Sequence, residues 1–74
     1  EINPRYTEAF NNRGNVYLEK GQWDQAIVDY TKSLETNPKF SEAYGNRGKA
    51  YYLKGDFDKA WEDIKKAQEE FKNQ

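Results

Sequence analysis

The stretch EAFNNRGNVYLEKG, residues 8–21, decides the fold, because residues 42–55 repeat it as EAYGNRGKAYYLKG. The repeat extends on both sides at the same offset of 34 (42 − 8). The outer matches are Asn3-Pro4 with Asn37-Pro38, Asp24 with Asp58, Ala26 with Ala60, and Asp29 with Asp63. Self-similarity at a fixed period of this length is the signature of a repeat architecture. We therefore interpret the chain as two copies of one structural unit.

Each unit is predicted to form two helices. Asn3 and Asn37 are expected N-caps, with Pro4 and Pro38 at the first helical position, where a missing N–H costs nothing. A glycine that follows a lysine is expected to end each first helix in the left-handed conformation, at Gly21 and at Gly55. The second helices should start near Trp23 and Phe57, because apolar residues follow each of these at helical spacing. The predicted order is helix A, helix B, helix A, helix B.

Three glycines lie inside the predicted A helices, where glycine costs about 1 kcal/mol relative to alanine. Gly14 and Gly48 recur in both units, which favours a close approach of helices A and B over a role in binding. Gly45 has Asn11 as its counterpart. It either makes room for a ligand backbone or is a tolerated defect, and both interpretations stay open.

Two arginines of the A helices recur with two aspartates of the B helices. A charge near a helix interface is costly unless it is paired. We therefore predict two structural ion pairs within the units, Arg13–Asp29 and Arg47–Asp63.

The composition excludes several classes of function. The 74 residues include no Cys and no His, which removes thiolate and imidazole metal ligands and the commonest general base. The net charge of −1 is spread along the chain, and no apolar run approaches the roughly 20 residues of a membrane span. The charged share is 34%, but the aromatic share of 16% can still build a thin core. We expect no cofactor, metal, nucleic acid or membrane partner, and no enzymatic activity.

The spacing of large and small residues resembles the tetratricopeptide repeat. The matching residues are Phe10, Gly14, Tyr17, Ala26, Tyr30 and Pro38, then Tyr44, Gly48, Tyr51, Ala60, Ile64 and Ala67. Ser33 replaces the usual Ala, and Arg13 and Arg47 replace the usual Leu. The resemblance implies an all-α domain, residues 1–74, of two tandem hairpins stacked as a short right-handed superhelical solenoid. Repeat one is expected at 7–40 and repeat two at 41–74, with 1–6 as the tail of a preceding repeat and the start of the first helix.

The same resemblance implies a scaffold for protein–protein interaction, with an extended peptide bound in a concave groove lined by the A helices. From the first unit the groove would take Glu8, Asn11, Asn12, Asn15, Leu18 and Glu19. From the second it would take Glu42, Gly45, Asn46, Lys49, Tyr52 and Leu53. Asparagine offers both donors and acceptors to a peptide backbone. Positive charge at Lys39, Arg47, Lys49 and Lys54 favours an acidic peptide or a C-terminal carboxylate.

A narrower resemblance is to the carboxylate-clamp subclass of these proteins, which holds free C-termini of heat-shock chaperones. Asn15 and Asn46 match its two asparagines in register. Asn11 stands where the clamp needs Lys, and the third repeat that supplies its other cations is absent from the sequence.

The alternative interpretation is a self-associating or engineered repeat module. Trp61, Ile64 and Phe71 of the last helix would be left uncovered, and exposed apolar patches of this kind mark interfaces. A homo-oligomer is the partner that this interpretation implies. Gln68 and the charges around it fit a solvated cap instead, and both remain open.

Overall fold

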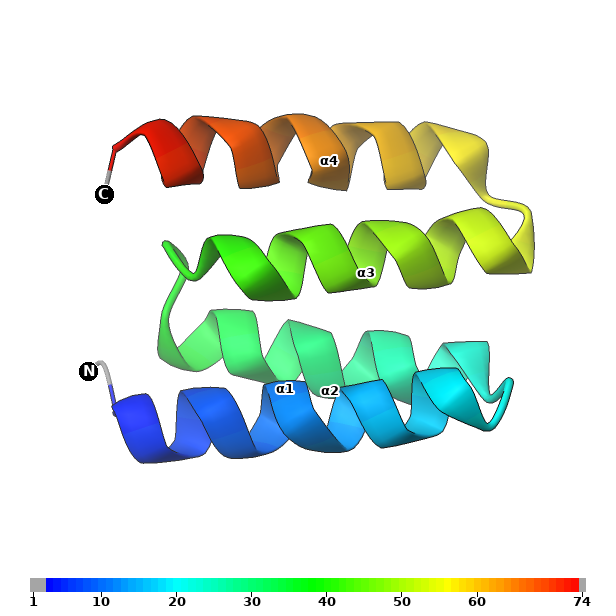
Figure 1. Ribbon diagram of the computed structural model, residues 1–74, viewed down its shortest axis with the longest axis horizontal. Helices are drawn as coiled ribbons and strands as arrows, with labels where there is room; N and C mark the ends of the chain where they lie inside the picture. The colour runs from blue at the N-terminus through cyan, green and yellow to red at the C-terminus, as the bar shows by residue number, and fades with distance from the viewer. Residues whose placement is uncertain (1–2, 74) are drawn as a thin grey trace.

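Four helices account for most of residues 3–73, the part of the chain that the computed structural model describes. They are α1 (Pro4–Glu19), α2 (Trp23–Thr36), α3 (Ser41–Lys54) and α4 (Phe57–Lys72). Each helix packs on the next in chain order, and α1 also contacts α3. Figure 1 shows the result as a stack in which α1 and α4 lie at opposite ends. The predicted all-α pair of stacked hairpins is confirmed, and within residues 3–73 no helix is long and apolar enough to cross a bilayer.

The helix starts follow the predictions except at α3. The Asn3 side chain accepts a hydrogen bond from the Arg5 amide, and Pro4 opens α1. The second helices begin at Trp23 and Phe57 as predicted. Asn37 was expected to cap α3, and this is wrong because α3 begins only at Ser41.

The reason is the reversal of the chain between α2 and α3. The Asn37 carbonyl accepts from the amide of Phe40 at 3.1 Å, and its side chain accepts from the amide of Lys39 at 3.1 Å. Both acceptors of Asn37 therefore stabilise a turn that contains Pro38, and neither is left to cap a helix.

Both A helices end at a glycine with positive φ, as predicted. Gly21 has φ 75° and Gly55 has φ 98°. The amide of Gln22 bonds back to the carbonyl of Tyr17, and that of Asp56 to the carbonyl of Tyr51, each at 2.9 Å. These are the backbone contacts of a Schellman motif, which satisfies carbonyls that the helix end would otherwise leave unpaired.

The central core joins the two hairpins. Ala26 and Tyr30 of α2 and Ala50 of α3 are fully buried and pack together. Gly14 lies directly against the Tyr30 ring: a Cβ added there would come within 2.6 Å of Cε1. A Cβ at Gly48 would come within 3.2 Å of the carbonyl oxygen of Ala60. The structural interpretation of both glycines is confirmed.

Both predicted ion pairs are present and bidentate. Arg13 contacts the two carboxylate oxygens of Asp29 at 2.7 and 2.9 Å, and Arg47 contacts those of Asp63 at 2.8 Å each. The hydrogen bond to the aspartate raises the pKa of each guanidinium above its ordinary value. Arg47 also donates to Thr31 of α2 at 3.1 Å, so it connects the two hairpins as well.

Candidate peptide-binding face

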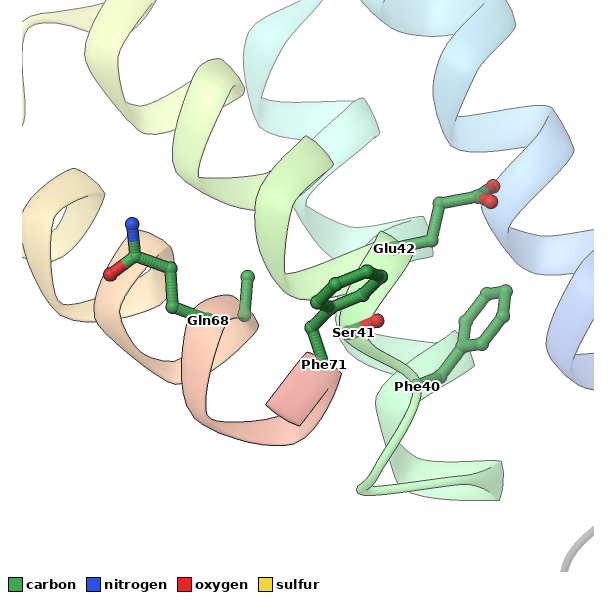
Figure 2. A pocket seen from close by; sticks show the side chains of 6 residues that line it. Phe40, Ser41, Glu42, Gln68 and Phe71 are labelled. Atoms are coloured by element: carbon green, nitrogen blue, oxygen red, sulfur yellow. The ribbon is translucent and has the colours of Figure 1, made fainter. Parts of the chain in front are cut away.

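Helices α1 and α3 are held side by side by a polar network. Asn11 of α1 donates to Glu42 of α3 at 2.6 Å and accepts from Asn46 of α3 at 3.1 Å. Figure 2 shows the Glu42 carboxylate turned toward α1, in agreement with the first of these bonds. Asn11 is only 1% exposed, so it joins the two repeats beneath the surface and does not face a ligand.

Eight of the predicted residues form two rows at the spacing i, i+4, i+7 and i+11, which places the members of each row on one side of their helix. We call these rows the groove face: Glu8, Asn12, Asn15 and Glu19 on α1, with Glu42, Asn46, Lys49 and Leu53 on α3. Asn15 and Asn46 are half-buried and the other six are exposed.

A hydrogen bond from the buried Tyr30 holds the Asn15 side chain in place. The Tyr30 hydroxyl donates to Asn15 Oδ1 at 2.5 Å, which leaves the NH₂ of Asn15 as a donor. Burial raises the pKa of Tyr30 from 10.0 to about 12, so the hydroxyl keeps its proton for this bond to a higher pH than an ordinary tyrosine does. Sequence reasoning missed this contact, because a Tyr at a consensus core position gives no sign of where its hydroxyl points.

Three further predicted groove residues lie away from the groove face. Leu18 is half-buried and packs against the central core. A Cβ built on Gly45 would point toward Ala67 of α4, 3.9 Å from its Cβ, so this glycine faces the contact between α3 and α4. Tyr52 packs its ring on Phe57, with centroids 5.4 Å apart, at the entry to α4.

The charges of the A helices are distributed differently from the sequence-based expectation. Arg47 pairs with Asp63, and Lys54 pairs with Asp24 of α2 at 2.5 Å, so both cations turn toward B helices. The groove face keeps one cation, Lys49, and three carboxylates. These are Glu8, Glu19 and Glu42.

A second feature lies where α3 begins and α4 ends. Figure 2 shows a hollow there, with the rings of Phe40 and Phe71 on its walls. Its volume is about 600 Å³, and its other lining residues are Ser41, Glu42, Ala67 and Gln68. Phe71 was predicted only as part of a self-association face, and no pattern in the sequence indicates a hollow beside it.

The residues predicted for self-association are exposed. Trp61 is 61% exposed, Ile64 is 39% and Phe71 is 72%. The Lys65 ammonium lies 5.8 Å from the centre of the Trp61 ring. Over residues 3–73 no group of acidic side chains is arranged to hold a metal ion.

Stacked helical hairpins of this kind define a helical-repeat scaffold for protein–protein interaction. The chain belongs to the tetratricopeptide repeat family: a family model described as "TPR repeat" matches residues 14–55, and one described as "Tetratricopeptide repeat" matches residues 41–73. No curated protein matches the chain.

Solved structures agree with this assignment. Two crystal structures of MamA are 38% and 40% identical, with TM-scores of 0.87 and 0.83, over 92% and 88% of this chain. A complex of the TPR2AB domain of yeast Sti1 with pHSP90 is 30% identical, with a TM-score of 0.92 over 99% of this chain. The chain spans 40%, 36% and 28% of these three chains, respectively.

Proposed function

We propose that the chain binds an extended peptide along the groove face. The observation that carries the proposal is the network of Asn11, Glu42 and Asn46, which fixes α1 against α3 and so sets the spacing between the two rows of side chains. Preorganised contacts of this kind lower the cost of ordering a bound peptide. The similar domain of yeast Sti1 was solved in complex with pHSP90, which supports peptide binding by this fold.

Backbone recognition would come mainly from Asn15. Its oxygen is occupied by the Tyr30 hydroxyl, so its NH₂ is oriented and available to a peptide carbonyl. Leu53 is 44% exposed on the α3 row and would contact an apolar side chain of the peptide. A peptide lying across both rows would therefore gain polar and apolar contacts together.

The charges on the groove face favour neutral or basic ligand side chains over acidic ones. Glu8, Glu19 and Glu42 outnumber Lys49, and like charges brought together across an interface disfavour binding. A C-terminal carboxylate would depend on Lys49 and the amides of Asn15 and Asn46. Recognition of a C-terminal carboxylate, as in the carboxylate-clamp subclass, is therefore the less favoured mode of peptide binding.

The test is an NMR titration with four peptides that share one extended apolar sequence. Two carry Lys and two carry Glu at alternate positions, and each pair has one free and one amidated C-terminus. We expect shifts at the side-chain amides of Asn15 and Asn46 and at the backbone amide of Leu53, stronger with Lys peptides and unaffected by amidation. Stronger binding of Glu peptides that is lost on amidation would replace this ligand by a carboxylate.

The variant Asn15→Ala should weaken binding roughly fivefold, because one hydrogen bond contributes about 1 kcal/mol and a tenfold change corresponds to about 1.4 kcal/mol. Gln25→Ala, an exposed amide on α2, is the matched control and should leave binding unchanged. An absence of shifts on the groove face at millimolar peptide would refute the proposal.

A further inference from the structure

We propose that copies of this chain stack head to tail. Helix α1 of one copy packs on α4 of the next copy in the same way that α3 packs on α2 within one chain. The inference goes beyond peptide binding and does not depend on it. It rests on the 34-residue repeat, which makes α4 the counterpart of α2 and α1 the counterpart of α3.

The first of the two surfaces that meet in this stack is an uncovered apolar face on the second hairpin. In the first hairpin, Leu18, Ile27 and Tyr30 pack in the core that Ala50 of α3 completes, and Tyr30 is fully buried. Their counterparts at the offset of 34 are Tyr52, Trp61 and Ile64, which we call the open face. They are 61%, 61% and 39% exposed, although the same positions are covered one repeat earlier.

The second of the two surfaces lies on α1. Ala43 and Ala50, seven residues apart on α3, are both fully buried. Their counterparts on α1 are Ala9 and Val16, which are exposed, Val16 by 50%. Helix α1 thus presents to solvent the counterparts of two alanines that α3 buries, one of which, Ala50, completes the central core. Because α1 and α4 lie at opposite ends of the stack (Figure 1), one copy cannot bring its own two faces together.

One charge contact would be reproduced between copies. Lys54 of α3 pairs with Asp24 of α2 at 2.5 Å. The counterparts are Lys20 at the end of α1 and Asp58 at the start of α4, and both are exposed. A second copy stacked in the same way brings Lys20 to Asp58.

The residue positions around the hollow at the end of α4 can also be compared with those at the end of α2, one repeat earlier. Phe40 follows the end of α2, where its amide bonds to the carbonyl of Asn37. The counterpart of Asn37 is Phe71, which lines the hollow, and the counterpart of Phe40 is Tyr6, which is 55% exposed. Stacking therefore directs Tyr6 of the second copy toward this hollow.

One pair of side chains opposes the stack and supplies a test. Arg47 donates to Thr31 of the preceding helix, but the counterparts of these residues are Arg13 and Lys65, which carry like charges. Lys65→Thr should therefore tighten the association severalfold. A tightening on loss of a surface charge is not expected from a face that is merely solvated.

The decisive experiment is sedimentation equilibrium of the full 74-residue chain from micromolar to millimolar concentration. A head-to-tail contact is heterologous and does not close at two subunits, so the average mass should rise past that of a dimer. Val16→Lys blocks the α1 end and Trp61→Lys blocks the α4 end. Both residues are exposed, and circular dichroism verifies that each variant folds.

Each variant alone should be monomeric, while an equimolar mixture should form a dimer and nothing larger, because one intact α1 face and one intact α4 face remain. A dimer of Val16→Lys alone would show α4 pairing with α4 and would overturn the proposal. A wild-type chain that stays monomeric at millimolar concentration would also overturn it. Neither result would affect the peptide titration.

Discussion

Replacing Gly14 by alanine should destabilise the chain, although alanine is the better helix former. The added Cβ would lie 2.6 Å from Cε1 and 2.8 Å from Cδ1 of Tyr30. The ring has little freedom to move away, because it is fully buried and its hydroxyl is bonded to Asn15 at 2.5 Å. The clash must therefore be relieved by separating α1 from α2.

The magnitude follows from two opposing effects. The gain in helix propensity on replacing an interior glycine by alanine is about 1 kcal/mol. Overpacking a well-filled core costs about 1–3 kcal/mol, and a contact this short against a fixed ring belongs at the upper end. We expect Gly14→Ala to lower the free energy of unfolding by about 1–2 kcal/mol.

Two other glycines provide a matched series. At Gly45 the added Cβ meets only the Cβ of Ala67 at 3.9 Å, so Gly45→Ala should stabilise the chain by up to about 1 kcal/mol. At Gly48 the added Cβ would lie 3.2 Å from the carbonyl oxygen of Ala60, which cannot move, and 3.0 Å from the side chain of Ile64, which is partly exposed and can move. The net effect of Gly48→Ala on the free energy of unfolding should therefore be close to zero.

Urea denaturation followed by circular dichroism measures all three variants, with unchanged m-values as the condition for comparing them. The expected order of stability is Gly45→Ala, then Gly48→Ala, then Gly14→Ala. If Gly14→Ala proved as stable as Gly45→Ala, the argument that glycine here serves the contact with Tyr30 would be refuted.

Three further predictions concern the buried polar groups and the turn. Asp63→Asn should lower the free energy of unfolding by about 2 kcal/mol, since hydrogen bonds to charged groups contribute roughly 1.5–3 kcal/mol. Asp29→Asn should cost less, because the Arg13 side chain is 56% exposed and that of Arg47 only 19%; urea midpoints that fall in the opposite order would contradict this. The pKa of Tyr30 is raised from 10.0 to about 12, so on raising the pH the unfolded chain loses this proton first, and its stabilising effect disappears between pH 10 and about pH 12. Urea midpoints across this window should fall more steeply for the wild type than for Tyr30→Phe, and equal slopes would exclude the effect. Gly55→Ala should cost about 1 kcal/mol through its φ of 98° alone, since within residues 3–73 no atom beyond its two chain neighbours lies within 4 Å of the added Cβ. Gly55→Asn should cost less in the same urea assay, and an equal or larger loss would argue against a conformational origin.

Much of the fold could be predicted because the sequence repeats it. The offset of 34 aligns both helices of each unit, so a signal too weak in one copy, such as Arg13 with Asp29, is strengthened by its return as Arg47 with Asp63. The start of α3 was mispredicted for the same reason. Asn37 has the same identity as Asn3, but it follows a helix and has to complete a turn.

The site was harder to predict because position on a helix does not determine hydrogen-bond partners. The family resemblance placed Asn11 in the groove, yet it is buried between Glu42 and Asn46. The expected acidic ligand rested on counting the cations of the A helices. That count could not reveal that Arg47 and Lys54 turn toward Asp63 and Asp24.

The contacts between neighbouring helices also imply an order in which the helices unfold locally. Among the helices of residues 3–73, α4 contacts α3 alone, whereas α2 is supported by both α1 and α3. In a linear array the stability of each element depends on its neighbours, so local unfolding should begin at α4 and proceed from there along the stack. The amide hydrogens of α4 should then exchange with solvent first and those of α2 last.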